Sequence, residues 1–340
     1  MTYAQYETSF RKKALNAGFS EDNILRCLEY AKPLVENDFP VIFNTTNLCA
    51  LVGYNKDYIK GAAIDPKFYY RSFKIKKSDN KFRFINEPLP SLKEIQLWIL
   101  ENILYRIKVS KFAKAYVRKR NIIDNVKYHI DKEKILSLDI KDFFPSLKRK
   151  TIEQIFYSLG YSSNISNLLS KLCCLHDSLP QGAPTSPCLS NIAMIEIDAY
   201  IANYCLERNV RYTRYADDLT FSGSFDDVDL KNFVMKQLTR LNMFLNEDKT
   251  RVMSRGQQQI VTGIIVNQKL QIPKEERKRI RLEMHYITLF GLSNHLERTK
   301  NTKANYLSHL QGKINYGLYI NPDDKELLKY KALLKEFEAL

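Results

Sequence analysis

Two adjacent aspartates, Asp217 and Asp218, lie within the run Arg-Tyr-Thr-Arg-Tyr-Ala-Asp-Asp-Leu-Thr-Phe-Ser (residues 211–222). The residues on either side of Ala-Asp-Asp alternate with a period of two, which predicts two strands joined by a tight turn. Such a turn brings both carboxylates to one hairpin tip, where they repel each other unless a cation lies between them. Because the chain has a net charge of +15 and a pI near 9.3, we expect divalent metal ions and nucleic acid at this tip.

A third aspartate, Asp139, ends the apolar run 134–139 and is followed by a bend near Pro145. Nucleotidyl transfer needs a clamp for hard cations: Mg²⁺ takes oxygen ligands, and two ions about 3.5–4 Å apart stabilise the attacking and leaving oxygens. Three carboxylates from two neighbouring strands would supply that clamp. The alternative is structural, because an Asp after a strand often caps a helix or forms a turn. The chain also holds two other aspartate doublets, at 226–227 and 323–324, so a doublet alone is not specific.

The run Leu-Pro-Gln-Gly-Ala-Pro-Thr-Ser-Pro (residues 179–187) predicts a rigid loop that leads into a helix near Ser186. A serine followed by proline is typical of a helix start. One interpretation is structural, that the run is simply the loop that leads into the helix. The other is functional, that the loop holds Gln181 against a nucleotide.

Taken in order, the runs at 139–146, 179–187 and 215–218 resemble motifs A, B and C of a reverse transcriptase. Three further runs resemble the bacterial retron reverse transcriptases: residues 211–220, Val-Thr-Gly at 261–263, and Asn-Val-Lys-Tyr-His at 125–129, where Val126 replaces the family's alanine. The resemblance covers residues 65–315. It implies an RNA-directed DNA polymerase.

The resemblance implies a metal site and a set of nucleotide contacts. Two Mg²⁺ ions, with Mn²⁺ as a substitute, would be held by Asp139, Asp217, Asp218 and the backbone carbonyl of Ile140. Phe144 would exclude a 2′-hydroxyl, although either Phe143 or Phe144 could be ordinary core. The other implied nucleotide contacts are Lys76, Arg83, Gln181, Ala216 and Lys249.

Two of these assignments have alternatives. Lys77 or Lys81 could exchange roles with Lys76, since all lie in one basic run. Lys249 stands beside two acidic residues, so it could equally form a surface ion pair of little consequence.

The basic residues cluster in three runs, at 67–83, 106–120 and 274–281. Solvated helix faces would explain any one of them, but three runs interleaved with aromatic residues favour binding of a phosphate backbone. By resemblance, 125–129 and 261–263 serve recognition of the cognate RNA, and the basic helix near 274–285 lies along the template–primer duplex. The predicted RNA contacts are Asn125, His129, Val261, Thr262, Gly263, Arg277, Lys278 and Arg281.

The predicted fold is α+β, a right-hand polymerase with fingers, an antiparallel palm sheet and a helical thumb. We expect a helical N-terminal extension at 1–60, fingers and palm at 61–265, and a basic thumb at 266–340. Strand-like alternation predicts a finger hairpin at 68–86, and a single long helix is expected at 186–207.

The composition also bears on the compartment. No apolar run approaches the ~20 residues of a membrane helix, and the N-terminus lacks a signal-peptide layout, so we expect a cytoplasmic protein without a membrane partner. The six cysteines show no C-x-x-C pairing and are expected to be free thiols.

The resemblance implies a retron enzyme that makes multicopy single-stranded DNA with a 2′,5′-branched RNA–DNA linkage from a cognate non-coding RNA and dNTPs. It also implies an antiphage defence unit with a separate effector protein. The alternatives are another bacterial defence or group II intron-like reverse transcriptase, or an RNA-binding scaffold that has lost catalysis.

Overall fold

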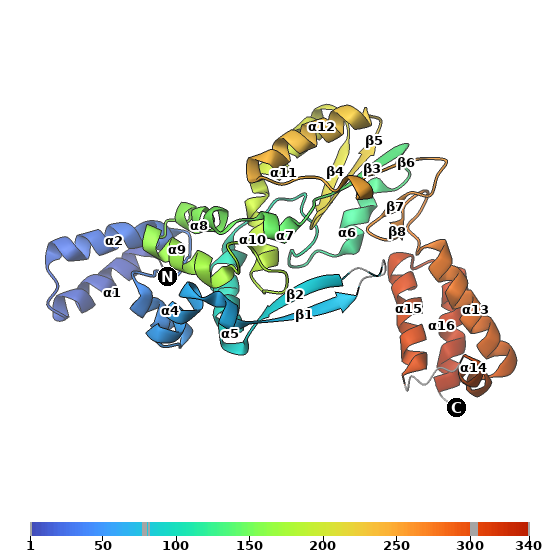
Figure 1. The fold of residues 1–340 in the computed structure, drawn as a ribbon, viewed down its shortest axis with the longest axis horizontal. Helices are drawn as coiled ribbons and strands as arrows, with labels where there is room; N and C mark the ends of the chain where they lie inside the picture. The colour runs from blue at the N-terminus through green and yellow to red at the C-terminus, as the bar shows by residue number, and fades with distance from the viewer. Residues whose placement is uncertain (1, 77–79, 81, 300–304, 339–340) are drawn as a thin grey trace. The chain divides into compact units, whose positions relative to one another are not determined.

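The computed structural model describes residues 2–76, 80, 82–299 and 305–338 (Figure 1). The chain forms two compact units, each assembled from separated stretches. The first unit comprises Met1–Arg118, Ile140–Asn203 and Lys231–Asn246, and the second comprises Lys119–Asp139, Tyr204–Leu230 and Glu247–Leu340. The predicted division at residues 60 and 265 is continuous in sequence, whereas these units are not.

The first unit is mainly helical. A capping box between Thr2 and Gln5 starts its first helix, and Ala14, Ile24 and Leu28 form a small core between the first two helices. Its helices are α1 (Tyr3–Asn16), α2 (Glu21–Glu36), α3 (Thr45–Val52), α4 (Lys56–Ile64), η1 (Pro66–Tyr69), α5 (Pro90–Asn102), η2 (Leu104–Arg106), α7 (Phe143–Ser146), α8 (Arg149–Ser158), α9 (Ser163–Cys173), α10 (Ser186–Ala193) and η4 (Thr239–Leu241). Helices α11 (Ile195–Glu207) and α12 (Asp227–Leu238) contribute residues to both units.

The first unit also contains the predicted finger hairpin, formed by β1 (Tyr70–Lys76) and β2 (Phe82–Pro88). The predicted single helix at 186–207 is wrong in one respect, because it is divided at Met194 into α10 and α11. Met194, with φ −86 and ψ 0, forms a turn between the two helices.

The second unit is built around a four-stranded antiparallel sheet with the order β4-β5-β3-β6. Its strands are β3 (Lys134–Asp139), β4 (Arg211–Tyr215), β5 (Asp218–Gly223) and β6 (Arg251–Ser254). Residues directly opposite on neighbouring strands share a face. Leu138 pairs with Leu219 and Leu136 with Phe221, so these buried side chains form an apolar face. Asp139, paired with Asp218, belongs to the opposite, more polar face.

Most of the remaining elements of the second unit pack on one core. That core draws side chains from β3, the hairpin β7–β8 and the C-terminal helices, for example Ile135, Ile264, Ile280 and Leu310. The elements are α6 (Ile122–Val126), η3 (Lys127–His129), η5 (Glu247–Lys249), β7 (Ile260–Val261), β8 (Ile264–Ile265), α13 (Lys274–Phe290), α14 (Leu292–Arg298), α15 (Tyr306–Ile320) and α16 (Lys325–Glu338).

Three predictions about the chain as a whole can be checked here. The α+β class is confirmed by the antiparallel sheets and the many helices. All six cysteines are free, and four of them are buried. No helix among the described residues is both long enough and apolar enough to cross a membrane.

Candidate functional site

The aspartate doublet lies at a two-residue hairpin turn, as the sequence predicted. Tyr215 of β4 pairs with Asp218 of β5, which leaves Ala216 and Asp217 as the turn residues. Ala216 has φ +59, a conformation that favours glycine and is typical of the first central residue of a type II′ turn. A strained backbone of this kind often marks a functional site, here at the residue that precedes the carboxylates.

A buried arginine supports this turn, and the sequence reading did not identify it. Arg214 is fully buried, and its Nη1 donates a hydrogen bond to the carbonyl oxygen of Ala216 at 3.1 Å. A charged side chain is rarely enclosed to this extent without a specific role. The only signal in the sequence is a charged residue within the alternating run, two positions before Ala216.

Asp139 and Asp218 lie directly opposite each other on β3 and β5. Such cross-strand neighbours have Cβ atoms about 4.5–5.5 Å apart, close enough for their carboxylates to interact strongly. Burial, followed by the charges of Asp217 and Asp139, raises the pKa of Asp218 to about 6. Asp217 and Asp218 lie at least 78 residues after Asp139 in the sequence. In the folded chain, Asp139 and Asp217 both act electrostatically on Asp218.

Lys249 contacts the same carboxylate group. Its Nζ lies 2.8 Å from Oδ2 of Asp139, and this hydrogen bond raises the pKa of Lys249 above its usual value. The Asp139 side chain is 8% exposed and that of Lys249 is 55% exposed. The pair is therefore no ordinary surface ion pair, because its acidic partner is buried beside a second carboxylate.

The donor chemistry of this cluster fits a hard divalent cation. Among the described residues, no three His, Cys, Asp or Glu side chains are already grouped as ligands of one metal ion. Instead, an ammonium group contacts Asp139, and Asp218 and Asp139 share a hydrogen bond that favours the protonated acid. Carboxylates crowded together, one of them with a raised pKa, gain when a divalent ion lies between them, and oxygen-only donors suit Mg²⁺.

In the first unit, the loop that carries Gln181 is fixed by its backbone. The Gln181 carbonyl accepts a hydrogen bond from the Asn86 amide of β2 at 2.8 Å. Gly182 has φ +128, and a Cβ there would lie 2.7 Å from the Asn86 carbonyl oxygen, so only glycine fits. The loop therefore rests against the finger hairpin.

The two phenylalanines after Asp142 differ in burial. Phe143 is 4% exposed and belongs to the core, whereas Phe144 is only partly buried and its ring lies 6.2 Å from that of Tyr116. This matches the expectation that one of the two is core, and it leaves Phe144 as the candidate sugar contact. Ile140 is buried and forms an isolated antiparallel bridge with Leu245.

The finger hairpin separates the two predicted triphosphate contacts. Lys76 pairs with Phe82, and Arg83 pairs with Ile75. Because side chains alternate along a strand, Lys76 lies on the face of Lys74 and Arg83 lies on the other face. One face of the hairpin therefore cannot present both cations. Lys77 and Lys81 lie outside the described residues.

The predicted RNA-contact segments lie close to each other, and some of their side chains point inward. Asn125 and His129 are both 0% exposed, and Nδ2 of Asn125 lies 3.4 Å from Oγ1 of Thr262. The run 260–266 forms the hairpin β7–β8, because Thr262 and Gly263 both have positive φ. Val261 is buried, whereas the space around Gly263 is open.

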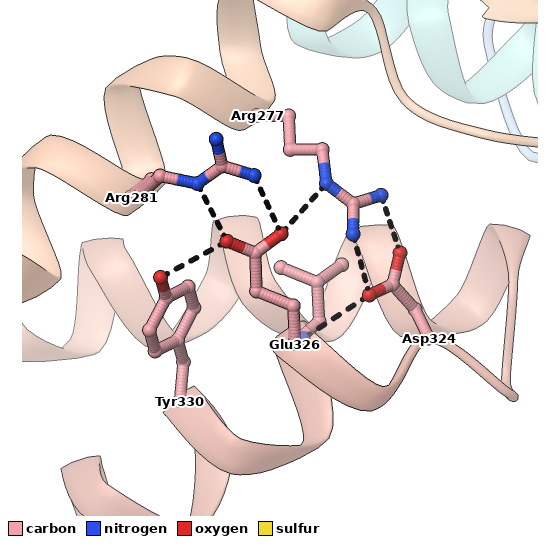
Figure 2. A network of polar contacts seen from close by, with 6 residues as sticks. Arg277, Arg281, Asp324, Glu326 and Tyr330 are labelled. Atoms are coloured by element: carbon pink, nitrogen blue, oxygen red, sulfur yellow. Dashed lines mark hydrogen bonds and ion pairs between the residues drawn. The ribbon is translucent and has the colours of Figure 1, made fainter.

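The basic residues of α13 have different surroundings (Figure 2). Arg277 makes a bidentate contact with Asp324 at 2.6 and 2.8 Å and a further contact with Glu326. Arg281 also contacts Glu326, at 2.7 Å. Both guanidinium groups thus connect α13 to α16, whereas the Lys278 side chain is 58% exposed. The prediction that these residues contact RNA remains a prediction.

An exposed face on α15 was missed by the sequence reading. Exposed positions recur at helical spacing along it and combine small, polar and aromatic side chains without an acidic residue. The recurrence of these positions with a period of 3.6 residues is the signal available in the sequence. These residues are Ser308, His309, Gly312, Asn315, Tyr316 and Tyr319.

The family described as Reverse transcriptase (RNA-dependent DNA polymerase) matches residues 75–309, more than half of the chain. The chain is 34% identical over 266 residues to the Retron Ec86 reverse transcriptase of Escherichia coli, covering 77% of this chain and 83% of that protein. It is 32% identical over 286 residues to the Retron Ec83 reverse transcriptase of Escherichia coli, covering 78% and 88%.

A telomerase from Candida albicans, solved with the TWJ fragment of telomeric RNA, matches with a TM-score of 0.44 and 13% identity over 79% of this chain and 62% of that one. That likeness is too low to carry an argument.

Reverse transcriptases generally use divalent metal ions, RNA templates and dNTPs, in agreement with the acidic hairpin tip and the basic composition described above. The family match also confirms the predicted right-hand polymerase fold, whose antiparallel palm sheet corresponds to β4-β5-β3-β6. The chain belongs to the retron reverse transcriptases, which are RNA-directed DNA polymerases.

Proposed function

We propose that this chain synthesises multicopy single-stranded DNA from a cognate structured non-coding RNA in the bacterial cytoplasm. The product carries a 2′,5′-branched RNA–DNA linkage, and the enzyme acts with a separate effector protein in antiphage defence. The family membership supports RNA-directed synthesis, and the similarity to two named retron enzymes supports the retron product.

One observation carries the catalytic part of the proposal: Asp139 and Asp218 face each other across β3 and β5, next to Asp217. We propose that these aspartates, with the Ile140 carbonyl, hold two Mg²⁺ ions, for which Mn²⁺ can substitute. When bound, the ions would activate the primer hydroxyl and neutralise charge on the triphosphate.

The protein's own side chains position the reactants. Ala216, small and held in its turn by Arg214, leaves room for the primer end beside the aspartates. Lys249, already charged and close to Asp139, is placed to donate a proton or neutralise the leaving pyrophosphate. Phe144 packs under the sugar and disfavours ribonucleotides, and Gln181 contacts the nucleotide from its fixed loop.

The cations of the finger hairpin would contact the triphosphate. Arg83 offers a planar guanidinium and Lys76 a point charge, so they suit different phosphate oxygens. Because they lie on opposite faces of the hairpin, we propose that only one of them contacts the triphosphate at a time. Comparing the KM for dNTP of Lys76→Ala and Arg83→Ala identifies which one.

RNA binding is proposed for three surfaces of the second unit. The tip of β7–β8 at Gly263 is open to a partner, Lys278 is exposed on α13, and the α15 face offers groups that can contact a duplex without repelling phosphate.

For the domain organisation, we propose that residues 1–60 form a helical extension, residues 61–265 the fingers and palm, and residues 266–340 the thumb.

The test uses the full-length protein and the RNA that co-purifies with it. Incubation with Mg²⁺ and dNTPs should yield DNA that is templated by that RNA and attached to it through a linkage resistant to 3′,5′-specific nucleases. Sequencing should show templated DNA. Untemplated DNA, or undiminished synthesis by the Asp217→Asn/Asp218→Asn variant, would contradict the proposal.

A further inference from the structure

His129 is a buried histidine placed between the two strands of the catalytic hairpin. It is 0% exposed, its Nδ1 lies 2.7 Å from Oγ of Ser222, and its Nε2 lies 2.8 Å from Oγ1 of Thr213. Ser222 belongs to β5 and Thr213 to β4, so a single imidazole connects both strands. Because a hydroxyl can donate or accept, either neutral tautomer satisfies both contacts.

The contacts lie on the face of the sheet that carries the aspartates. Thr213 pairs with Thr220, and alternation along β5 places Thr220, Ser222 and Asp218 on one face. Asp139 shares that face as the partner of Asp218. His129 therefore fixes the base of the hairpin on the same face on which Asp139 and Asp218 meet.

The segment that carries His129 is itself anchored. A capping box between Asn121 and Asp124 starts α6, and the buried Val126 packs in the core of the second unit. Asn125, also buried, contacts Thr262. The imidazole thus extends from a fixed support, and the two hydroxyls it contacts are almost completely enclosed.

We propose that His129 is a positioning residue for polymerisation: by holding β4 and β5 in register, it fixes the turn that presents Asp217 and Asp218. This inference rests on the proposed role of those aspartates in metal binding. It gives the 125–129 run a part in catalysis through the hairpin, whereas the resemblance suggested RNA contact. A displacement of reacting groups by about 1 Å can lower a rate a hundredfold, so a hairpin anchor of this kind has a measurable effect.

The test compares four full-length variants, and a combination of two of them, on oligo(dT)-primed poly(rA) with dTTP and Mg²⁺. His129→Leu removes both hydrogen bonds, His129→Gln can keep one, and Thr213→Val/Ser222→Ala removes the hydroxyl partners. The control is Tyr161→Phe, which deletes a partly buried hydrogen bond to the Pro40 carbonyl in the other unit.

We expect kcat to fall about tenfold to a hundredfold in His129→Leu, less in His129→Gln, and not in the control. The Mg²⁺ concentration for half-maximal rate should rise, while the Kd for the co-purifying RNA changes less than about twofold. Adding Thr213→Val/Ser222→Ala to His129→Leu should cause little further loss, because both changes disrupt the same contacts.

Three results would overturn the inference: a wild-type kcat in His129→Leu, a weakened RNA Kd with kcat intact at saturating RNA, or an equal kcat loss in Tyr161→Phe. If His129→Leu does not fold, His129→Gln and the hydroxyl variant decide the question by the same measurements. Full activity in Asp217→Asn/Asp218→Asn would instead disprove the metal site itself, whatever the His129 variants show.

Discussion

Carboxyl groups have opposite electrostatic surroundings at the catalytic hairpin and at the α13–α16 contact. On the hairpin side, burial and neighbouring carboxylates raise the pKa of Asp218 to about 6. Between α13 and α16, hydrogen bonds from Arg281, then Arg277, lower the pKa of Glu326 to about 2. One cluster holds acids that are crowded with other acids, and the other holds acids matched by guanidinium groups (Figure 2).

This difference separates a functional cluster from a structural one. In the α13–α16 network, Asp324 and Glu326 are neutralised by Arg277 and Arg281 within the fold. At the hairpin, Lys249 contacts Asp139, while burial and the neighbouring carboxylates raise the pKa of Asp218. A cluster in which neighbouring carboxylates raise the pKa of one member is suited to an external cation.

The largest effect is expected from removing charge at the hairpin tip. Asp217→Asn/Asp218→Asn should lower kcat about a thousandfold or more, because the carboxylates act together in holding the metal ions. Primer extension with Mg²⁺ measures this. The matched control is Asp226→Asn at another aspartate doublet, where the side chain accepts hydrogen bonds from backbone amides and Asn can do the same. A control that loses as much activity as the double variant would remove the distinction between doublets.

Breaking the α13–α16 network should act on stability. Arg277→Met leaves Asp324, whose side chain is 5% exposed, without its guanidinium partner, and should cost about 3–5 kcal/mol of unfolding free energy. Thermal or urea unfolding measures the loss. Arg277→Met/Asp324→Asn should recover part of it, since no buried charge remains and Asn can still cap α16. Arg279→Met, at a side chain that is 72% exposed, should change stability little. Equal losses in Arg277→Met and Arg279→Met would contradict a structural role for the network.

Replacing Lys249 should change the catalytic rate more than the affinity for the nucleotide. Its raised pKa keeps the ammonium charged through neutral pH, so Lys249→Met should lower kcat about tenfold to a hundredfold with a smaller change in the KM for dNTP. Steady-state kinetics at saturating template measure both constants. Lys236→Met, on α12, serves as the control. An unchanged kcat in Lys249→Met would make the contact with Asp139 purely structural.

The smallest effect concerns stability and pH without metal. Because the folded-state pKa of Asp218 is raised to about 6, folding favours its protonated form, and that contribution is lost as pH rises through about 6. In EDTA, the wild-type protein should therefore lose about 1–2 kcal/mol of stability between pH 4 and pH 7 relative to Asp218→Asn. Urea unfolding at several pH values measures the difference, and Mg²⁺ should restore only the wild type. A parallel pH dependence in both proteins would contradict the raised pKa.

Sequence reading predicted the parts of the site that depend on local pattern. Alternation around Ala216, the apolar run ending at Asp139 and the proline-rich loop at Gln181 each predicted the element that the structure contains. The prediction that these elements belong to one polymerase came from the family resemblance, because no local sequence pattern shows that β3 pairs with β5.

The features that could not be predicted depend on contacts with residues that are distant in the sequence. Arg277 looked like a free cation, but Asp324, 47 residues later, neutralises it. His129 reaches strands 84 and 93 residues away, and the separation of Lys76 from Arg83 follows from hairpin register rather than from composition. Charge runs therefore overstate the cations that are free to bind nucleic acid.

The most direct test is calorimetric titration of the metal-free full-length protein with Mn²⁺. Wild type should show saturable binding that is lost in Asp139→Asn and in Asp217→Asn, while Asp226→Asn should titrate like wild type. Unchanged Mn²⁺ binding in Asp139→Asn would show that the three aspartates do not form a shared cation site.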